Sequence, residues 1–246
     1  MMTKGLILAG GSGTRLYPIT KVVNKHLIPI GKYPMIYYPV QTLVRSGITE
    51  IMVISGPQSI GAIAELLGSG RAFGCNFCFR VQEQPIGISD GIRLAREFTS
   101  TDRLMVMLGD NLVSEAFAET VREFEQSSVG CRIFLKELPS VEGLGVACIN
   151  KGAVTKVVEK PEKFISNFAV TGIYLFDGRC FDLIEKLYPS DRNELEITDL
   201  INAYIQMKSC DSVFLTGMWL DAGTFESLGK AAGLFEKTEW YSRENR

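Results

Sequence analysis

The chain has 246 residues, of which 46% are hydrophobic and 22% are charged, and its 26 basic and 28 acidic side chains give a net charge of −2. This composition is typical of a folded globular protein and excludes a fibrous or strongly charged disordered chain. Because there is no basic excess, nothing indicates nucleic-acid binding, and any anionic ligand must be held by local groups.

The chain contains six cysteines and one histidine, His26. Cys75 and Cys78 have C-x-x-C spacing, but neither a second cysteine pair nor a histidine cluster completes a zinc site, so we expect reduced structural thiols. No apolar stretch reaches the roughly 18 residues that span a bilayer, and the start of the chain does not resemble a signal peptide. We therefore expect a cytoplasmic protein with no membrane partner.

Apolar runs and helical patterns alternate over the first half of the chain. Four largely apolar runs predict buried strands, at 5–9, 50–55, 76–82 and 103–108. Helical patterns separate or follow them, at 35–47, 60–70, 89–98 and 114–126. Gly47 is a candidate C-cap and Ser114 a candidate N-cap. Strands that are apolar on both faces favour a parallel sheet covered by helices on both sides.

The second half of the chain has strand-like runs separated by short turns, at 132–138, 146–150, 154–160 and 168–177. Two helices are expected next, at 179–187 and 197–208, and a strand follows at 212–216. The segment 217–224 leads into a final helix at 224–237.

The glycine-rich segment LAGGSGTRLYPIT (8–20) directly follows the first predicted strand. It is not a dinucleotide fingerprint, because Leu16 stands at the third glycine position and Pro18 would disrupt the helix that should open there. The acidic residue expected about 20 residues further on is also missing. The Walker pattern fails as well, since the loop reads G-T-R where G-K-[ST] is required.

The same loop retains features of a phosphate site. Gly10, Gly11 and Gly13 should permit positive φ angles that turn several N–H groups toward one point, and such a nest binds an anion. Thr14 adds a hydroxyl donor, and Arg15 adds a planar fork suited to phosphate oxygens. The loop alone leaves two possibilities open, a phosphate site or a glycine-rich surface turn.

Ten spaced motifs follow one order along the chain: GGSGTRLYPIT, KHLIPI, KYPMIYYPV, VQEQPIG, LGDN, GLGVA, VEKP, VTGIYLFD, SDRNELEIT and WLDAGT. Together they closely resemble the signature of the sugar-1-phosphate nucleotidylyltransferases, and within them the shorter type of glucose-1-phosphate thymidylyltransferases. The resemblance covers nearly the whole chain. It implies a Rossmann-like three-layer α/β/α fold with a mostly parallel, mixed central sheet and a small additional β element around the sugar site.

The resemblance also implies one nucleotidyltransferase domain over residues 1–246. Residues 1–128 would mainly bind the nucleotide. Residues 129–246 would mainly bind the sugar phosphate and supply the C-terminal helices. We further expect a homo-oligomer, either a dimer or a tetramer, and a place in the dTDP-rhamnose pathway. Because many thymidylyltransferases run further than this chain, we expect weaker or altered feedback inhibition.

The reaction implied by the resemblance is transfer of a thymidylyl group from dTTP to α-D-glucose 1-phosphate, giving dTDP-glucose and pyrophosphate. The sugar phosphate would attack the α-phosphorus in line, with help from Mg²⁺. Two alternatives remain open: the same chemistry with UTP or another hexose 1-phosphate, and a non-catalytic sensor of nucleotide sugars. A sensor would be expected to have lost a metal or phosphate ligand.

Five charged residues receive catalytic roles from the resemblance. Asp110, at the end of a predicted strand, and Asp221, in WLDAGT, would hold Mg²⁺. Arg15 would bind the triphosphate tail and the leaving pyrophosphate, Lys25 would contact the α-phosphate, and Lys160 would grip the phosphate of the sugar. Taken singly, each aspartate could instead be a helix cap or turn former, and each cation a solvated surface side chain.

The nucleotide site is implied at ten positions: Leu8, Gly10, Gly11, Gly13, Thr14, Arg15, Gln82, Pro85, Gly87 and Asp90. The amide of Gln82 can donate and accept at once, which suits the edge of thymine or uracil. Pro85 would flank the ring and Gly87 would leave room for it. Asp90 would either meet the ribose 3′-hydroxyl or cap its own helix. We expect UTP to be used beside dTTP, because one methyl group is resolved by only about 1–3 kcal/mol.

The sugar-phosphate site is implied at seven positions: Leu108, Asn111, Gly145, Glu159, Lys160, Val170 and Trp219. Sugar hydroxyls need both donors and acceptors, and the carboxylate of Glu159 can accept two hydroxyl hydrogens. Two departures from the family pattern are present. The chain reads ISDGIRLA after the base loop, where small residues are common. Asn193 stands where a glycine is common, which could alter the turn at Arg192.

Overall fold

The computed structural model describes residues 2–100 and 102–235. These residues form two compact units. Unit 1 comprises residues 2–3, 86–100, 102–106 and 120–216, and unit 2 comprises residues 4–85, 107–119 and 217–235. Neither unit is continuous in sequence. The single domain expected over residues 1–246, with its division at 128, stays a prediction.

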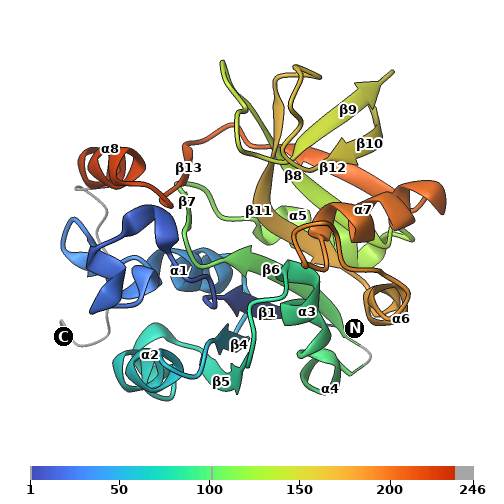
Figure 1. Ribbon diagram of the computed structural model, residues 1–246. Helices are drawn as coiled ribbons and strands as arrows, with labels where there is room; N and C mark the ends of the chain where they lie inside the picture. Colours follow the sequence, from blue (N-terminus) through green and yellow to red (C-terminus); the bar gives the residue numbers. More distant parts are fainter. Residues whose placement is uncertain (1, 101, 236–246) are drawn as a thin grey trace. The chain divides into compact units, whose positions relative to one another are not determined.

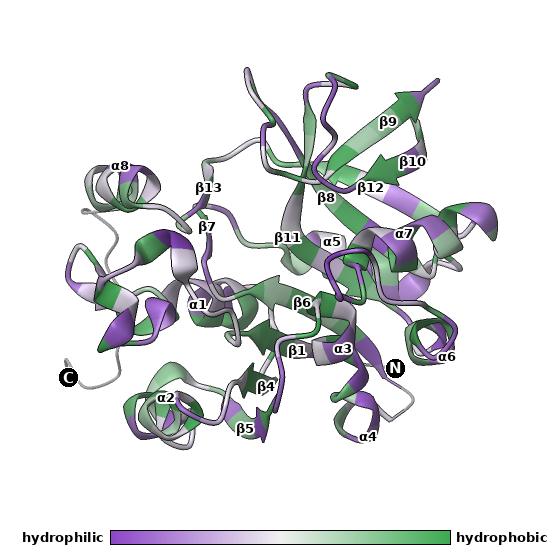
Figure 2. Ribbon diagram, viewed as in Figure 1, coloured by the Kyte–Doolittle hydropathy of each residue, from purple (hydrophilic) through white to green (hydrophobic). Residues whose placement is uncertain are grey.

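Parallel strands form the sheet of unit 2: β1 (Thr3–Leu8, in this unit from residue 4), β4 (Glu50–Ser55) and β5 (Asn76–Val81) (Figure 1). Leu6 of β1 is paired with Met52 of β4, and Met52 is paired with Cys78 of β5. Figure 2 shows β1 and β4 as strongly hydrophobic. Strands β1 and β4 are mostly apolar and buried on both faces of the sheet, as the sequence predicted. Strand β5 is less buried than predicted, since Asn76 and Cys78 are exposed.

Helices α1 (Tyr37–Arg45) and α2 (Ile60–Leu67) connect these strands. Helix α1 ends at the predicted glycine: Gly47 has φ 85°, and the N–H of Ile48 donates to the carbonyl of Leu43 over 3.0 Å, which is the Schellman type of C-cap. Short 3₁₀ turns occur at Thr14–Leu16, Ile19–Lys21, Lys25–Leu27 and Arg71–Phe73.

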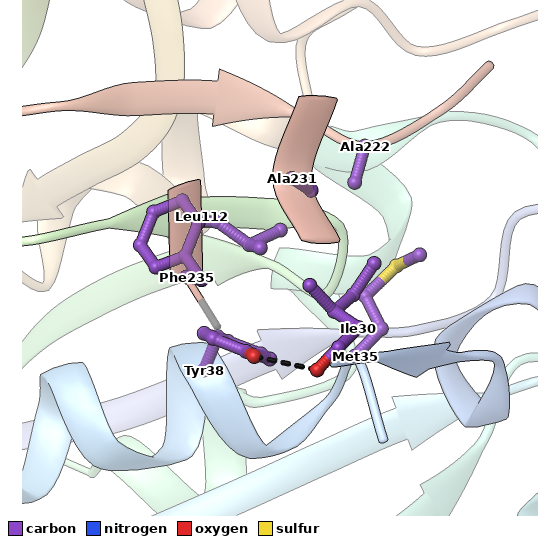
Figure 3. Packing of buried hydrophobic residues seen from close by; sticks show 7 residues of the cluster. All are labelled: Ile30, Met35, Tyr38, Leu112, Ala222, Ala231 and Phe235. Carbon is purple, nitrogen blue, oxygen red and sulfur yellow. Dashed lines mark hydrogen bonds between the residues drawn. The ribbon is translucent and has the colours of Figure 1, made fainter. Parts of the chain in front are cut away.

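Unit 2 also contains two small antiparallel sheets, β2 (Pro29–Ile30) with β3 (Tyr33–Pro34) and β7 (Asn111–Val113) with β13 (Trp219–Asp221). Helix α8 (Phe225–Phe235) follows β13. A buried cluster joins these distant segments, and it consists of Ile30, Met35, Tyr38, Leu112, Ala222, Ala231 and Phe235 (Figure 3). The hydroxyl of Tyr38 donates to the carbonyl of Ile30 over 2.8 Å. The buried hydroxyl of this cluster therefore has a hydrogen-bond partner.

Unit 1 contains a mixed sheet whose strands are β8 (Cys131–Glu137), β9 (Val146–Asn150), β10 (Ala153–Val158), β11 (Phe168–Phe176) and β12 (Cys210–Phe214). Strand β11 is antiparallel to both β8 and β9, β10 is antiparallel to β9, and β12 is parallel to β8. Strand β6 (Arg103–Leu108) begins in unit 1, and its last two residues belong to unit 2.

The helices that begin in or belong to unit 1 are α3 (Ile88–Arg93), α4 (Arg96–Thr99), α6 (Arg179–Ile184) and α7 (Ile197–Gln206). Helix α5 (Ala118–Gln126) lies in unit 1 from residue 120 onward. The helix predicted at 89–98 is therefore wrong in extent, because the backbone leaves the helical conformation at Ala95 and two shorter helices replace it.

Ser114 does not begin a helix as predicted. Its backbone N–H donates to the carbonyl of Met218 over 3.1 Å, and its hydroxyl oxygen accepts from the N–H of Met218 over 2.9 Å. Ser114 thus extends the pairing of β7 with β13, and α5 starts four residues later at Ala118. The predicted final helix is observed as far as Phe235, and residues 236–237 of it lie outside the described residues.

The α/β fold class with a mixed central sheet and additional small β elements is confirmed. All six cysteines, each in the described part of the chain, are free thiols. None of the helices in residues 2–100 and 102–235 is long and apolar enough to cross a membrane.

Candidate active site

The glycine loop follows β1 and is shaped by Gly13. Gly13 has φ 64°, and the hydroxyl of Thr20 donates to its carbonyl over 3.0 Å. A Cβ atom at this position would lie only 2.8 Å from the Thr20 methyl group, in a conformation that side chains disfavour. The 3₁₀ turn Thr14–Leu16 begins directly after it, which places Thr14 and Arg15 at the start of the turn.

Gly10 and Gly11 serve a different purpose from the one predicted, because neither has a positive φ. They leave room for other side chains instead. A Cβ at Gly10 would lie 3.0 Å from Oε1 of Gln82, and one at Gly11 would lie 3.4 Å from Nζ of Lys25. The backbone at these glycines can thus approach two of the predicted binding residues closely.

A pocket of about 330 Å³ lies beside the loop within unit 2. Its lining includes Gly10, Gly11, Gln82 and Pro85, which are predicted nucleotide-binding residues, and Lys25, which is predicted to contact the α-phosphate. The volume falls in the range of small-molecule sites. Gln82 is buried and directly follows β5, where its backbone N–H donates to the carbonyl of Ser55 over 2.9 Å. The structure therefore brings the glycine loop and the Gln82 segment to one cavity.

Lys25, which lines this pocket, forms a buried ion pair with Asp110. Nζ of Lys25 donates to Oδ2 of Asp110. Burial by itself would raise the pKa of Asp110, but the charge of Lys25 and hydrogen bonds from Lys25 and Asn111 hold the pKa well below its usual range. Asp110 is therefore an ionised carboxylate at neutral pH.

Asn111, next to Asp110, connects it to β13. Its amide nitrogen donates to Oδ1 of Asp110 over 3.2 Å, and its amide oxygen accepts from Nε1 of Trp219 over 2.7 Å. Leu108, at the end of β6, stands two residues before Asp110. Asn111 and Trp219 are thus held together in unit 2, as members of the predicted sugar-phosphate set.

Asp221 is brought beside Asp110 by strand pairing. Asp221 stands opposite Asn111 in the β7–β13 register, and the N–H of Ala222 donates to the carbonyl of Asp110 over 2.9 Å. Burial and then the charge of Asp110 raise the pKa of Asp221 to about 6, although Arg15 and Lys25 oppose this shift. Two carboxylates 111 residues apart in sequence, at 110 and 221, are therefore close enough to repel each other.

Arg15 reaches the same place from the glycine loop. One of its guanidinium nitrogens lies 3.9 Å from Oδ2 of Asp221, and its side chain is 60% exposed. Gly223 makes this approach possible, because a Cβ there would lie 2.5 Å from the guanidinium and 2.7 Å from Oδ1 of Asp221. The guanidinium is therefore free to turn toward a ligand, since a long and exposed ion pair holds it weakly.

In unit 1 a second group of predicted residues lies together. The N–H of Val170 donates to the carbonyl of Gly145 over 2.8 Å, and a Cβ at Gly145 would lie 3.6 Å from Oε2 of Glu159. Nζ of Lys160 lies 3.6 Å from Oε1 of Glu159. Burial raises the pKa of Glu159, whereas Lys160 and Arg192 counteract that rise. The four residues assigned to the sugar phosphate in this half of the chain are thus neighbours.

A comparison with known proteins identifies the family. A family model described as "Nucleotidyl transferase" matches residues 4–238. The chain belongs to this family. The nucleotidyl transferase is 39% identical over 241 residues to the glucose-1-phosphate thymidylyltransferase of Neisseria meningitidis, covering 96% of this chain and 83% of that one. It is 40% identical over 237 residues to the enzyme of the same name from Xanthomonas campestris pv. campestris, covering 95% and 80%.

Solved structures agree with this assignment. A crystal structure from Bacillus anthracis, described as a candidate glucose-1-phosphate thymidylyltransferase in complex with sucrose, is similar to this nucleotidyl transferase with a TM-score of 0.94. The two are 43% identical, and the similarity covers 99% of each chain. A UDP-glucose pyrophosphorylase complexed with UDP-glucose is 24% identical, with a TM-score of 0.85 over 97% of this chain and all of that one; it shows the fold alone. The resemblance and the enzyme class read from the sequence are confirmed.

Two predicted nucleotide positions of the nucleotidyl transferase lie in unit 1. Asp90 is buried in the first turn of α3, and its Oδ1 accepts from Arg93 over 2.6 Å, so it is paired within its own helix. Gly87 has φ 112°, and a Cβ there would lie 2.5 Å from the carbonyl oxygen of Leu195. The glycine is thus explained by close packing against another backbone segment.

Asn193 adopts the left-handed conformation that a glycine would take, with φ 63°. Asparagine tolerates this region better than most residues. Its N–H donates to the carbonyl of Ser190 over 2.8 Å, and the N–H of Ser190 donates to the carbonyl of Glu194 over 2.9 Å. The turn before α7 is therefore formed in this nucleotidyl transferase despite the departure from the family pattern.

The part played by His26 was not predicted from the sequence. Its ring is buried against Gly109, where a Cβ would lie 2.5 Å from the imidazole, and Nδ1 is 2.8 Å from Oδ1 of Asn24. Burial first, and then Lys25, lower the pKa of His26 to about 3. A neutral imidazole therefore packs against Gly109, near enough for the charges of Lys25 and Asp110 to act on it. Its position between Lys25 and an apolar run was the available signal.

Proposed function

We propose that this nucleotidyl transferase transfers a thymidylyl group from dTTP to α-D-glucose 1-phosphate, forming dTDP-glucose and releasing pyrophosphate. One observation carries the proposal: the β7–β13 pairing sets Asp221 beside Asp110, with Lys25 bonded to one carboxylate and Arg15 near the other. The names of the relatives from Neisseria meningitidis and Xanthomonas campestris pv. campestris support the choice of substrates.

The pocket of unit 2 would hold the nucleotide. Backbone at Gly10 and Gly11 would approach the phosphates, and Thr14 and Arg15 would donate to the triphosphate tail. The amide of Gln82 would pair with the edge of thymine, with Pro85 at the wall of the same cavity. Leu8, at the end of β1, would contribute backbone where the strand opens into the loop.

Asp110 and Asp221 would hold Mg²⁺. The residues present fit a cation, because Oδ1 of Asp221 is buried and accepts no hydrogen bond within the described part of the chain. Residues 2–100 and 102–235 contain no group of three or more potential metal-binding side chains, so phosphate and water would complete the coordination. Bound there, the ion would stabilise the negative charge of the phosphates.

The chemistry needs no general base, because the attacking sugar phosphate is already an anion. A bond forms between its oxygen and the α-phosphorus, the bond to the β-phosphate oxygen breaks, and pyrophosphate leaves with that electron pair. Catalysis then consists of positioning and charge stabilisation. Lys25 would contact the α-phosphate, and Arg15 would stabilise the leaving pyrophosphate. Lys160, in unit 1, would bind the phosphate of the sugar.

Sugar hydroxyls would be recognised by neutral and acidic groups. In unit 1, Glu159 would accept hydroxyl hydrogens beside the backbone of Gly145 and Val170. In unit 2, Asn111 and Trp219 would contribute an amide and a ring, next to Leu108 at the end of β6. The half-buried carboxylate of Glu159 suits this task because it can accept two hydrogen bonds at once.

A pyrophosphate-release assay over a panel of triphosphates and sugar 1-phosphates tests the proposal. We expect the highest kcat/KM with dTTP and glucose 1-phosphate. With UTP, kcat/KM should be lower by about 10–200-fold at most, because the two bases differ by one methyl group. A clear preference for another pair would reassign the substrates within the same chemistry. If no pair of substrates released pyrophosphate, the result would favour a nucleotide-sugar sensor.

A further inference from the structure

An ionic cluster in unit 1 surrounds Arg192 in the turn before α7. Glu196 is its most buried member, with 7% of its surface exposed. It stands at the N-cap position of α7, with φ −71° and ψ 139°, yet its side chain makes no capping hydrogen bond. The short side chains of Ser, Thr, Asp and Asn commonly accept from the first turn of a helix at this position, whereas the longer side chain of Glu196 is bonded to Arg192.

Both carboxylate oxygens of Glu196 are directed at the guanidinium of Arg192. Oε1 accepts from Nε over 3.1 Å, and Oε2 accepts from a terminal nitrogen, Nη2, over 2.7 Å. The hydroxyl of Ser190 also donates to Oε1 over 2.6 Å. The pair is bidentate, and such a fork fixes the orientation of the guanidinium as well as its distance.

The oriented guanidinium points onward to Glu159. The same Nη2 that bonds Glu196 lies 3.3 Å from Oε1 of Glu159. Burial and the charge of Glu196 raise the pKa of Glu159 and so disfavour its ionised form, whereas Lys160 and Arg192 oppose that rise. If the two hydrogen bonds between Glu196 and Arg192 were loosened, Glu159 would lose Arg192 as a hydrogen-bond donor but would still be repelled by the charge of Glu196.

We propose that Glu196 is a positioning residue for the sugar subsite, which acts through Arg192 to hold the Glu159 carboxylate ready for the sugar hydroxyls. This inference rests on the proposed function and adds a residue to it. Glu196 does not touch the substrate. Its contribution is to direct one nitrogen of the Arg192 guanidinium at Glu159. An ammonium group, which lacks the planar geometry of a guanidinium, would be oriented less well.

Glu194 provides a matched control. It lies on the same turn, and its Oε2 is 3.4 Å from the same nitrogen of Arg192. Its side chain is 39% exposed, against 9% for Glu196. Removing its charge should therefore perturb the net charge of the cluster equally while leaving the bidentate fork intact.

Steady-state kinetics of Glu196→Gln and Glu194→Gln with dTTP and glucose 1-phosphate test the inference. We expect E196Q to raise the KM for glucose 1-phosphate about tenfold, with the KM for dTTP and kcat changed by less than about twofold. E194Q should change all three by less than about twofold. Equal effects of the two variants, or a rise of both KM values in E196Q, would overturn the inference.

A double-mutant cycle with Glu159→Gln separates positioning from general stability of the turn. In the E159Q background, E196Q should raise the KM for glucose 1-phosphate by less than about twofold further, because contacting groups are not additive. An undiminished effect would show that Glu196 acts without Glu159. If E196Q does not fold, Arg192→Lys, which keeps the charge and loses the fork, should show the same selective rise in KM; an unchanged KM would contradict the inference.

These outcomes separate the inference from the proposed function. A wild-type enzyme that releases no pyrophosphate with glucose 1-phosphate would refute the function and the inference with it. An active wild type whose E196Q and R192K variants both retain the wild-type KM would refute the inference alone.

Discussion

Lys25 and Asp110, 85 residues apart in the chain, form an ion pair in which the side chains are 12% and 8% exposed. Breaking such a pair from one side leaves a buried charge without compensation. The pairing ties the segment after the glycine loop to the end of β6, and it puts a cation where the α-phosphate would lie in the proposed reaction.

Replacing Lys25 by methionine should therefore lower kcat/KM by at least about 100-fold, as expected for a donor that stabilises developing charge. The pKa of Asp110 should rise, because its main compensating cation is gone. Pyrophosphate release under dTTP-saturating conditions measures the effect. Lys25→Arg, which keeps the charge, should recover part of the rate. A K25M enzyme with near-normal turnover would remove Lys25 from the mechanism.

Gly223→Ala should lower activity by displacing Arg15 and Asp221, since its Cβ would lie 2.5 Å from one side chain and 2.7 Å from the other. We expect a loss of about tenfold or more in kcat/KM for dTTP, the scale of misplacing a catalytic group by about 1 Å. Gly229→Ala in α8 is the control, because nothing lies within 4 Å of its added Cβ. Equal activities of the two variants would show that the space at Gly223 is not needed.

Asp221→Asn should abolish activity and yet stabilise the metal-free fold. The pKa of Asp221 in the folded state is raised to about 6. The folded protein therefore loses stability as the pH rises and Asp221 ionises, and it keeps this stability only at lower pH, where the carboxyl is protonated. At pH 7.5 the amide avoids this cost, and we expect Tm to rise by roughly 2–4 °C, the shift that about 1 kcal/mol produces at this size.

Thermal unfolding with and without MgCl₂ completes that experiment. Mg²⁺ should raise the Tm of the wild type, because a ligand that binds only the folded state stabilises it, and should leave D221N unchanged. An equal Mg²⁺ response in both proteins would place the ion elsewhere.

Lys160→Ala should reduce kcat/KM for glucose 1-phosphate by at least about 100-fold, because the sugar phosphate would lose its charged donor. Lys163→Ala is the matched control, since Lys163 is an exposed lysine three residues further on the same segment. Initial rates against glucose 1-phosphate concentration distinguish the two variants. The assignment of Lys160 fails if K160A and K163A are equally active.

Gly10→Ala should weaken dTTP binding while leaving stability nearly unchanged. The added Cβ would lie 3.0 Å from Oε1 of Gln82, so the flexible amide would move and the base would lose its partner. We expect the KM for dTTP to rise about tenfold, the value of one hydrogen bond. Gly61→Ala in α2, where nothing lies within 4 Å, should keep the wild-type KM. The role of Gln82 would be contradicted by an unchanged KM in G10A.

Local patterns were sufficient for much of the fold. Strands β1, β4 and β6 are continuous apolar runs, and a run that is buried on both faces carries its own signal. Helix α5 was placed too early because Ser114, a good N-cap by type, bonds to Met218 instead. Strands β7 and β13 were missed because three-residue strands have no period of their own, and only their mutual pairing makes them strands.

The amino-acid sequence by itself determined which chemical groups this protein has and where its glycine loop, its apolar strands and its charged motifs stand along the chain. The tertiary structure alone decided that Asp221 is paired opposite Asn111, that His26 packs against Gly109, and that the side chain of Glu196 is bonded to Arg192. The physical reason is range: periodic burial acts over a few neighbouring residues, whereas pairing between distant residues depends on how whole elements pack.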